Sequence, residues 1–225
     1  MSTTFTLSDA LSLRDLQVFL SRAGRVEDGS VRLIATNGVL AVYVAVFYPV
    51  GLLDQAPTVL GLRTFEVSET EDFDAVVPVG SLLERIARLE LVVEDDSAAV
   101  AVTLPMQVHT VTWAAISPPR GGWLALPGTA AQLLGTVAKS GIDEVAQAIP
   151  TGTGEQIVHR VRSEVWGRPI DGLEHVPAGG AFAALSLGFL GEADAVEIYE
   201  TGPWTRLTTQ RGHVLIKRKA WTLAR

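Results

Sequence analysis

The chain has 225 residues, no cysteine and a formal net charge of −7. Apolar residues make up 48% and charged residues 19%, which is the composition of a globular protein and not of a disordered one. The lack of cysteine excludes disulfides, thiolate catalysis and cysteine–metal sites, and the negative charge argues against non-specific binding of nucleic acid.

Neither a membrane span nor a signal peptide is predicted. The longest apolar stretch, Val39–Leu53, is shorter than the roughly 20 residues of a membrane helix, and it contains Pro49 and Gly51. Residues Met1–Thr6 are polar and lack a basic region followed by an apolar one. We therefore expect a cytoplasmic protein that makes no contact with a membrane.

The first part of the chain is predicted to hold a helix followed by a β-hairpin. Apolar residues recur at helical spacing after Ser12, and Gly24 is a suitable end for this helix. The apolar runs Val31–Ala35 and Val39–Phe47 are separated by an Asn-Gly pair. Asn-Gly favours a type I′ turn, whose twist matches that of the two strands, so we expect a tight hairpin.

Strand–helix junctions with Pro and Gly occur three times, at residues 76–80, 124–128 and 175–179. Proline is tolerated in the first helical turn and glycine permits a sharp change of direction. We therefore expect helices over 82–89, 129–138 and 180–190, the last apolar all round and central, with Phe182, Leu185 and Phe189 inside.

Further elements are predicted between and after these junctions. The chain is expected to form strands at 91–94, 100–104 and 107–116, a short helix at 142–149, a helix at 153–166, and a final meander of strands at 195–200, 204–209 and 213–217. The Pro- and Gly-rich run 117–122 is the best boundary between two halves, 1–120 and 121–225.

These elements predict an α+β fold of antiparallel sheets with packed helices. A helix followed by a hairpin recurs at 12–47, 81–113 and 180–218, which indicates an internal duplication of strand–helix–hairpin units. Alternation of this kind also arises by chance, and 142–166 departs from the repeat because it looks helical where strands are expected.

No catalytic residue can be assigned from the sequence. The four histidines, at 109, 159, 175 and 213, show no metal-binding spacing, so we expect neither a metal nor another cofactor. Asp171, Glu174 and His175 are clustered and could perform acid–base chemistry, with Arg120 as an anion-binding neighbour. The alternative is that these acids cap the loop before a helix.

The strongest electrostatic feature is an asymmetry of charge. Residues 54–98 hold eleven acids and three arginines, whereas residues 205–225 hold six bases and no acid. The predicted contact surface is Trp204, Arg206, Arg211, His213 and Lys217. Such residues bind proteins or nucleic acids, and they also pack internally against a chain's own acidic region.

The repeated strand–helix–sheet units resemble the layout of processivity clamps, and Val76–Leu89 is the most similar piece. That resemblance implies basic helices facing DNA, but 180–190 has no charged residue and 129–140 has only Lys139. We therefore predict first a non-catalytic binding or scaffolding protein that has a protein partner or self-associates. The alternatives are an enzyme or small-ligand-binding protein with a site near His175 and Arg120, and a clamp-like nucleic-acid-binding protein.

Overall fold

The computed structural model describes residues 3–27, 29–51, 54, 56–68, 71–149, 152–191 and 193–218. The chain forms two compact units. The first unit holds residues 1–46 and 62–117, and the second holds residues 47–61 and 118–225. Strand β4 (Thr58–Ser68) begins in the second unit and ends in the first. The predicted boundary at residue 120 stays a prediction, since compactness does not test whether the halves fold separately.

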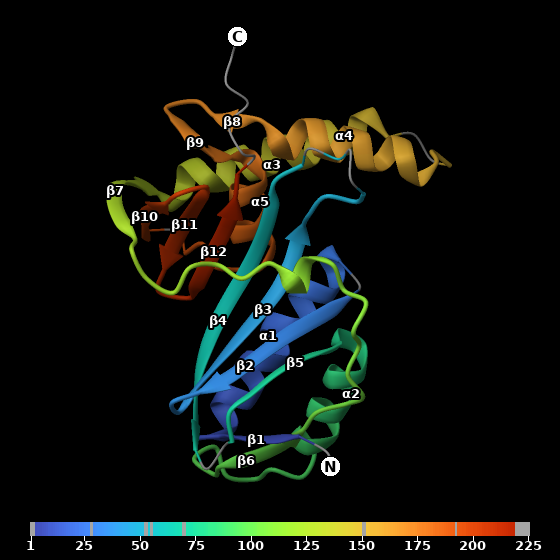
Figure 1. The fold of residues 1–225 in the computed structure, drawn as a ribbon, viewed down its shortest axis with the longest axis vertical. Coiled ribbons are helices and arrows are strands. Elements are labelled where there is room, and N and C mark those ends of the chain that lie inside the picture. Colours follow the sequence, from blue (N-terminus) through green and yellow to red (C-terminus); the bar gives the residue numbers. More distant parts are fainter. Residues whose placement is uncertain are drawn as a thin grey trace. The chain divides into compact units, whose positions relative to one another are not determined.

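The first unit is an antiparallel sheet with two helices (Figure 1). Its strands follow the order β5–β2–β3–β4, and β1 pairs with both β4 and β6. Its other elements are β1 (Thr4–Leu7), α1 (Ala10–Val26), β2 (Ser30–Thr36), β3 (Val39–Phe47), β5 (Phe73–Pro78), α2 (Val79–Glu90), β6 (Val100–Thr103) and the 3-10 turn η1 (Trp113–Ala115).

In the second unit, the strands of this ten-stranded sheet follow the order β4–β12–β11–β10–β7, and β8 pairs separately with β9. Helices α3 and α5 pack against each other, and α4 packs on both. Its elements are β7 (Leu124–Ala130), α3 (Ala131–Ala148), α4 (Glu155–Gly167), β8 (Pro169–Ile170), β9 (Leu173–Pro177), α5 (Ala178–Ser186), β10 (Ala195–Thr201), β11 (Trp204–Thr209) and β12 (Gly212–Lys217).

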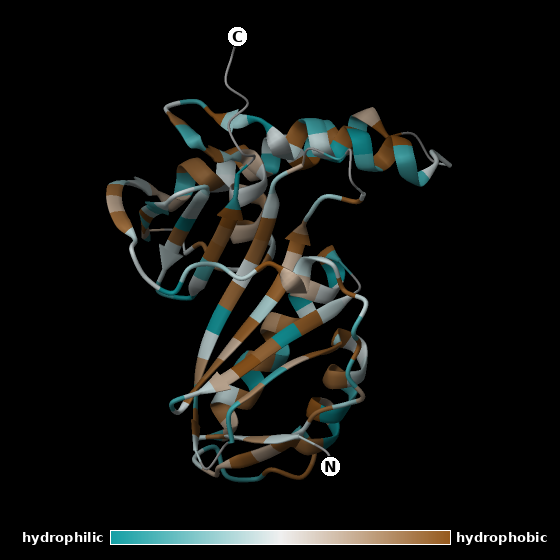
Figure 2. Ribbon diagram, in the orientation of Figure 1, coloured by the Kyte–Doolittle hydropathy of each residue, from teal (hydrophilic) through white to brown (hydrophobic). Residues whose placement is uncertain are grey.

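Periodicity explains why these segments form these elements. Every second side chain of β2 is buried, and these residues, Val31, Leu33 and Ala35, are all apolar. Figure 2 colours the strands by hydropathy. The carboxylate of Asp9 accepts a hydrogen bond from the backbone N–H of Ser12 at 2.6 Å, so Asp9 and not Ser12 caps α1. Gly24 lies inside α1, where an added Cβ would reach only ordinary contact with Val79.

The predicted α+β class is confirmed. The tight hairpin is also present, because Thr36 pairs with Val39 and the two residues between them, Asn37 and Gly38, have φ of 52° and 77°. The helix predicted at 153–166 corresponds to α4. Within the described residues, no helix is both long enough and apolar enough to cross a membrane.

Two predicted strands of the first unit are wrong. Residues 91–94 form a turn after α2, and Leu91 and Val92 are exposed. Residues 107–116 run irregularly into η1, where Trp113 and Ala114 are both buried. The last residues of this segment, Trp113–Ala115, form a turn of 3-10 helix, so the alternation seen in the sequence does not produce a strand.

The three Pro–Gly junctions have two different outcomes. Pro78 and Pro177 directly precede α2 and α5, as predicted for a strand that runs into a helix. The remaining pair, Pro127-Gly128, lies inside β7, and α3 begins later, at Ala131. Helix α3 then runs without interruption through the segment predicted as a separate short helix, 142–149.

The helix predicted at 180–190 is shorter than expected, since α5 ends at Ser186. Its alanines and glycines are buried, but Phe182 and Leu185 are only half-buried. Phe182 stacks on the buried Trp166, with ring centroids 4.4 Å apart. Phe189 is buried as predicted, although it lies beyond the end of the helix.

Candidate interaction surface

The structure brings four of the five predicted contact residues to one face of the sheet. Trp204 and Lys217 are register partners, and so are Thr208 and His213. Because alternate residues of a strand share a face, Trp204, Arg206, His213 and Lys217 project from the same side. Arg211 lies in the turn that joins β11 to β12.

Arg206 is held by two aromatic rings. Its guanidinium carbon lies 4.4 Å from the ring centre of Tyr199, its register partner on β10, and 4.7 Å from that of Trp123. The Trp123 indole N–H donates to the carbonyl of Pro119 at 3.2 Å. Two cation–π contacts restrict the guanidinium, so Arg206 connects the segment before β7 to the sheet.

The five side chains differ in exposure. Trp204 is 5% exposed and supports the face from within, whereas Arg211 and Lys217 are exposed. His213 is half-buried and its Nδ1 lies 3.0 Å from the Thr208 hydroxyl. Burial lowers the pKa of His213, and the nearby charge of Arg206 lowers it further. His213 is therefore neutral at neutral pH, and the exposed charge comes from Arg211 and Lys217.

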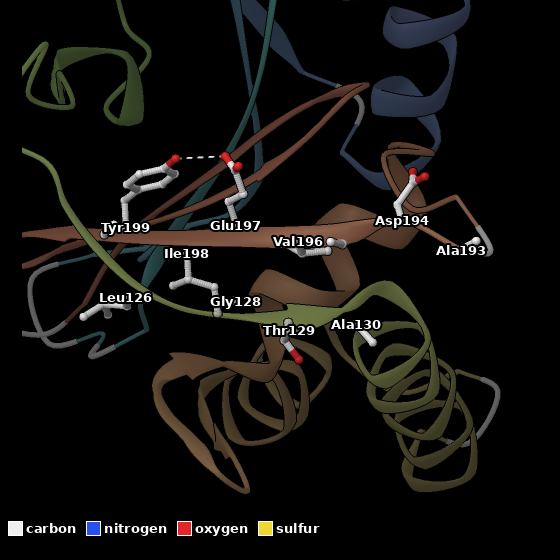
Figure 3. Close-up of a pocket in the computed structure, with 12 residues that line it drawn as sticks. Leu126, Gly128, Thr129, Ala130, Ala193, Asp194, Val196, Glu197, Ile198 and Tyr199 are labelled. Atoms are coloured by element: carbon white, nitrogen blue, oxygen red, sulfur yellow. Dashed lines mark hydrogen bonds between the residues drawn. The ribbon is translucent and has the colours of Figure 1, made fainter.

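A groove that the sequence did not predict follows β7 and β10. It has a volume of about 630 Å³ and is lined by residues 125, 126, 128–130 and 193–199. Figure 3 shows Glu197 and Tyr199 on one face of β10 and Ile198 on the other. The Tyr199 hydroxyl donates to the Glu197 carboxylate at 2.8 Å.

The groove lies at an irregularity in the pairing of β7 with β10. Val196 pairs with Thr129 and Ile198 with Leu126, so two residues of β7 oppose Glu197 alone. A Cβ on Gly128 would lie 2.8 Å from the Val196 carbonyl oxygen, so only glycine fits there. The Pro-Gly pair within an apolar run was the sequence signal for this bulge, and it was interpreted as a helix start.

The residues predicted for an enzyme site lie on different segments of the second unit. His175 lies on β9 with its Nε2 buried and without a hydrogen-bond partner, while Arg120 is exposed in the segment before β7. The Glu174 carboxylate accepts from the backbone of Gly172, as a turn-capping acid does. Within the described residues, no group of three or more metal-binding side chains gathers.

A second cluster was also missed. The Nε2 atom of His159 lies 3.3 Å from the Asp54 carboxylate, and its Nδ1 lies 3.4 Å from the Ser163 hydroxyl. Asp54 also accepts hydrogen bonds from the backbone of Val50 and Ala56. We interpret the cluster as a structural contact that holds this loop against α4. His159 and Ser163 are four residues apart on that helix, so their side chains lie on the same face.

Comparison with family models covers both parts of the chain. Residues 1–114 match the family described as "Domain of unknown function (DUF8010)", and residues 118–221 match "Domain of unknown function (DUF8185)". The chain belongs to the DUF8010 family. A comparison with curated proteins finds no match.

Comparison with solved structures identifies the fold. The DNA polymerase sliding clamp from Caulobacter crescentus is 13% identical, with a TM-score of 0.52 over 99% of this chain and 67% of the clamp. Caulobacter crescentus pol III beta is 12% identical, with a TM-score of 0.53 over 98% of this chain and 66% of that protein. DNA polymerase III subunit beta from Borrelia burgdorferi is 6% identical, with a TM-score of 0.51 over 95% of this chain and 64% of that protein. The chain thus has a sliding-clamp fold and spans about two thirds of these chains' length.

Proposed function

We propose that this chain is a non-catalytic, clamp-like binding protein that associates with a second copy of itself and with a protein partner. The observation that supports this most strongly is the sliding-clamp fold over nearly the whole chain. The chain covers about two thirds of the length of these clamps. A cytoplasmic location accompanies this proposal.

The proposed partner surface is the sheet face of Trp204, Arg206, Arg211, His213 and Lys217. This proposal is supported by two features of the face, namely restrained side chains within it and cations exposed on it. Trp204 is buried and Arg206 makes cation–π contacts with two rings, whereas Arg211 and Lys217 reach solvent. A rigid surface loses little conformational freedom on binding, and its cations favour an acidic protein partner.

The helices favour a protein over DNA as the partner. Helix α1 contains three arginines, Arg14, Arg22 and Arg25, and one acid, Asp15. Helix α3 contains one lysine and two acids, and α5 contains no charged residue. Arg14 is itself paired with Asp96 at 2.7 Å. Binding of duplex DNA depends on cations that neutralise phosphates, and these helices are close to neutral in sum.

A nucleic-acid clamp is the second candidate, and the fold is the observation that favours it. An enzyme or ligand-binding site near His175 and Arg120 stays a prediction, and the groove on β7 and β10 includes neither residue.

Sedimentation and DNA titration together test the proposal. We expect wild-type protein to self-associate with rising concentration, and we expect labelled duplex DNA to bind weakly at both low and high salt. A chain that stays monomeric at every concentration would overturn the proposed self-association. Tight DNA binding that falls steeply with salt would replace the proposal with the nucleic-acid clamp.

The sheet surface is tested with an Arg211→Glu/Lys217→Glu variant in the same experiments and in binding to a purified acidic partner, once identified. The matched control is Arg88→Glu/Lys139→Glu, which reverses two exposed charges elsewhere. Equal effects of the two variants would show that net charge, and not this surface, governs binding.

A further inference from the structure

Arg206 is a half-buried cation whose hydrogen-bond donors are unused. Its Nε atom is buried and unpaired, and no described residue accepts a hydrogen bond from its guanidinium or forms an ion pair with it. Its contacts with Tyr199 and Trp123 are with aromatic rings, which supply no oxygen acceptor. Because a buried polar group without a partner is costly, this arginine is suited to bind an acceptor that another molecule supplies.

Two other half-buried arginines of this chain show the usual arrangement. The guanidinium of Arg32 donates to both carboxylate oxygens of Asp74. The Nε atom of Arg218 is also unpaired, but its Nη2 donates to the carbonyl of Gly202 at 3.0 Å. Arg206 differs from both, because neither an acid nor a carbonyl of the described residues meets its guanidinium.

A carboxylate matches these unused donors. A guanidinium presents its N–H groups as a planar fork that binds both oxygens of a carboxylate, and such charge-assisted hydrogen bonds are stronger than neutral ones. Lys217 adds an exposed cation on the same face, because its register partner Trp204 is two residues from Arg206 along β11. Side chains related in this way lie ~7–8 Å apart, close to the two-residue repeat of an extended chain, ~6.6–6.8 Å.

We propose that Arg206 binds a carboxylate of the acidic protein partner, and that Trp123 moves off the guanidinium when this carboxylate binds. The partner segment is extended and carries acids at alternate positions, so that a second carboxylate reaches Lys217. This inference rests on the acidic partner proposed above and names the residue that recognises it.

Trp123 can leave the guanidinium because few contacts hold its segment. Its indole N–H donates to Pro119 of the same segment and not to the sheet. In the second unit, no described backbone group of residues 118–122 hydrogen-bonds to another backbone group. A Cβ on Gly121 would meet nothing within 4 Å, so the chain before Trp123 has room to move. Displacement of the ring exchanges a cation–π contact for charge-assisted hydrogen bonds.

Binding of a short acidic peptide tests the role of Arg206. A labelled Glu-Ala-Glu-Ala-Glu peptide should bind the full-length protein at low salt. Arg206→Lys should weaken this binding about tenfold, because lysine keeps the charge but loses the fork. Arg211→Lys is the matched control at an exposed arginine in the adjacent turn, and it should leave the affinity nearly unchanged. Both variants are compared at a temperature where thermal unfolding shows them to be folded, and equal affinities would contradict the proposal.

Trypsin cleavage after the exposed Arg120 reports whether Trp123 moves. Saturating acidic peptide should speed this cleavage severalfold in wild type, because the segment leaves the sheet, whereas a Gln-Ala-Gln-Ala-Gln peptide should not change it. Trp123→Ala should be cleaved at the faster rate with or without the peptide. An unchanged rate in wild type that has bound the acidic peptide would show that Trp123 stays in place, and would overturn the proposed displacement.

These outcomes separate the inference from the proposed function. If the acidic peptide binds wild type and Arg206→Lys equally well, the inference is wrong and the proposed partner surface stands. If wild type does not bind the peptide even at low salt, the inference and the acidic partner are both wrong. Self-association is decided independently of both results by sedimentation without the peptide.

Discussion

The two units differ in whether another segment hydrogen-bonds to the edge strand. In the first unit, the backbone N–H of Val108 donates to the carbonyl of Val76 on β5, so a following segment covers that edge. Arg32 fixes the same segment, because it donates to the Ala114 carbonyl and the Ser117 hydroxyl. In the second unit, no described strand pairs with the outer edge of β7.

The two units therefore use their polar contacts in different places. Arg32 also forms a two-pronged pair with Asp74, with nitrogen–oxygen distances of 2.8 and 2.6 Å, so the first unit closes its edge with one arginine. In the second unit, Gly141 and Gly179 lie close to Trp166, where an added Cβ would come within 2.4 Å and 3.3 Å of its side chain. Variants of each unit can test how much its stability depends on these contacts.

The largest effect is expected in the core of the second unit. Phe189→Ala should lower the free energy of unfolding by about 3–5 kcal/mol, because Phe189 is almost fully buried. The half-buried Phe182 is the matched comparison, and Phe182→Ala should cost clearly less. Denaturant unfolding measures both, and a larger loss at Phe182 would mean that its stack on Trp166 dominates the packing.

A pair of glycines in α3 tests close packing directly. A Cβ on Gly141 would lie 2.4 Å from the Trp166 ring, whereas one on Gly135 would meet nothing within 4 Å. Gly141→Ala should therefore destabilise by about 1–3 kcal/mol, and Gly135→Ala should stabilise by roughly 0.5–1 kcal/mol through helix propensity. Thermal or urea unfolding of both variants would contradict this packing if the two changes had the same sign.

In the first unit, the hydrogen bonds of Arg32 are expected to contribute to stability. Arg32→Met keeps the length of the side chain but loses the pair with Asp74 and the two hydrogen bonds to the covering segment. We expect a loss of about 1–3 kcal/mol and faster hydrogen exchange at the Val108 amide. Unchanged exchange there would show that the edge is covered without help from Arg32.

The smallest effect is a pH dependence in the second unit. The pKa of His213 lies below its ordinary 6.5 in the folded chain, so the folded state binds this proton less readily than the unfolded state does. The free energy of unfolding should therefore fall as the pH drops below about 6.5. His213→Asn should flatten this dependence, and His109→Asn, at an exposed position, should leave it unchanged.

Part of the candidate surface was predictable and part was not. The spacing of Trp204, Arg206, His213 and Lys217 on a predicted meander already placed them on neighbouring strands. The contacts of Arg206 could not be foreseen, since Trp123 lies more than eighty residues away in sequence and meets it only through the fold. The Asp54–His159 contact was missed for the same reason.

Local preferences were enough to predict the α+β class, the Asn-Gly hairpin and the two junctions at Pro78 and Pro177, because periodicity and backbone preference act over a few residues. The conformations at Pro127-Gly128 and at Gly141 depend instead on residues that are distant in the chain. At Gly128, the approach of the Val196 carbonyl turns an apparent helix start into a strand bulge. At Gly141, the Trp166 ring takes the space of a side chain, so a residue that looks like a helix stop lies inside α3.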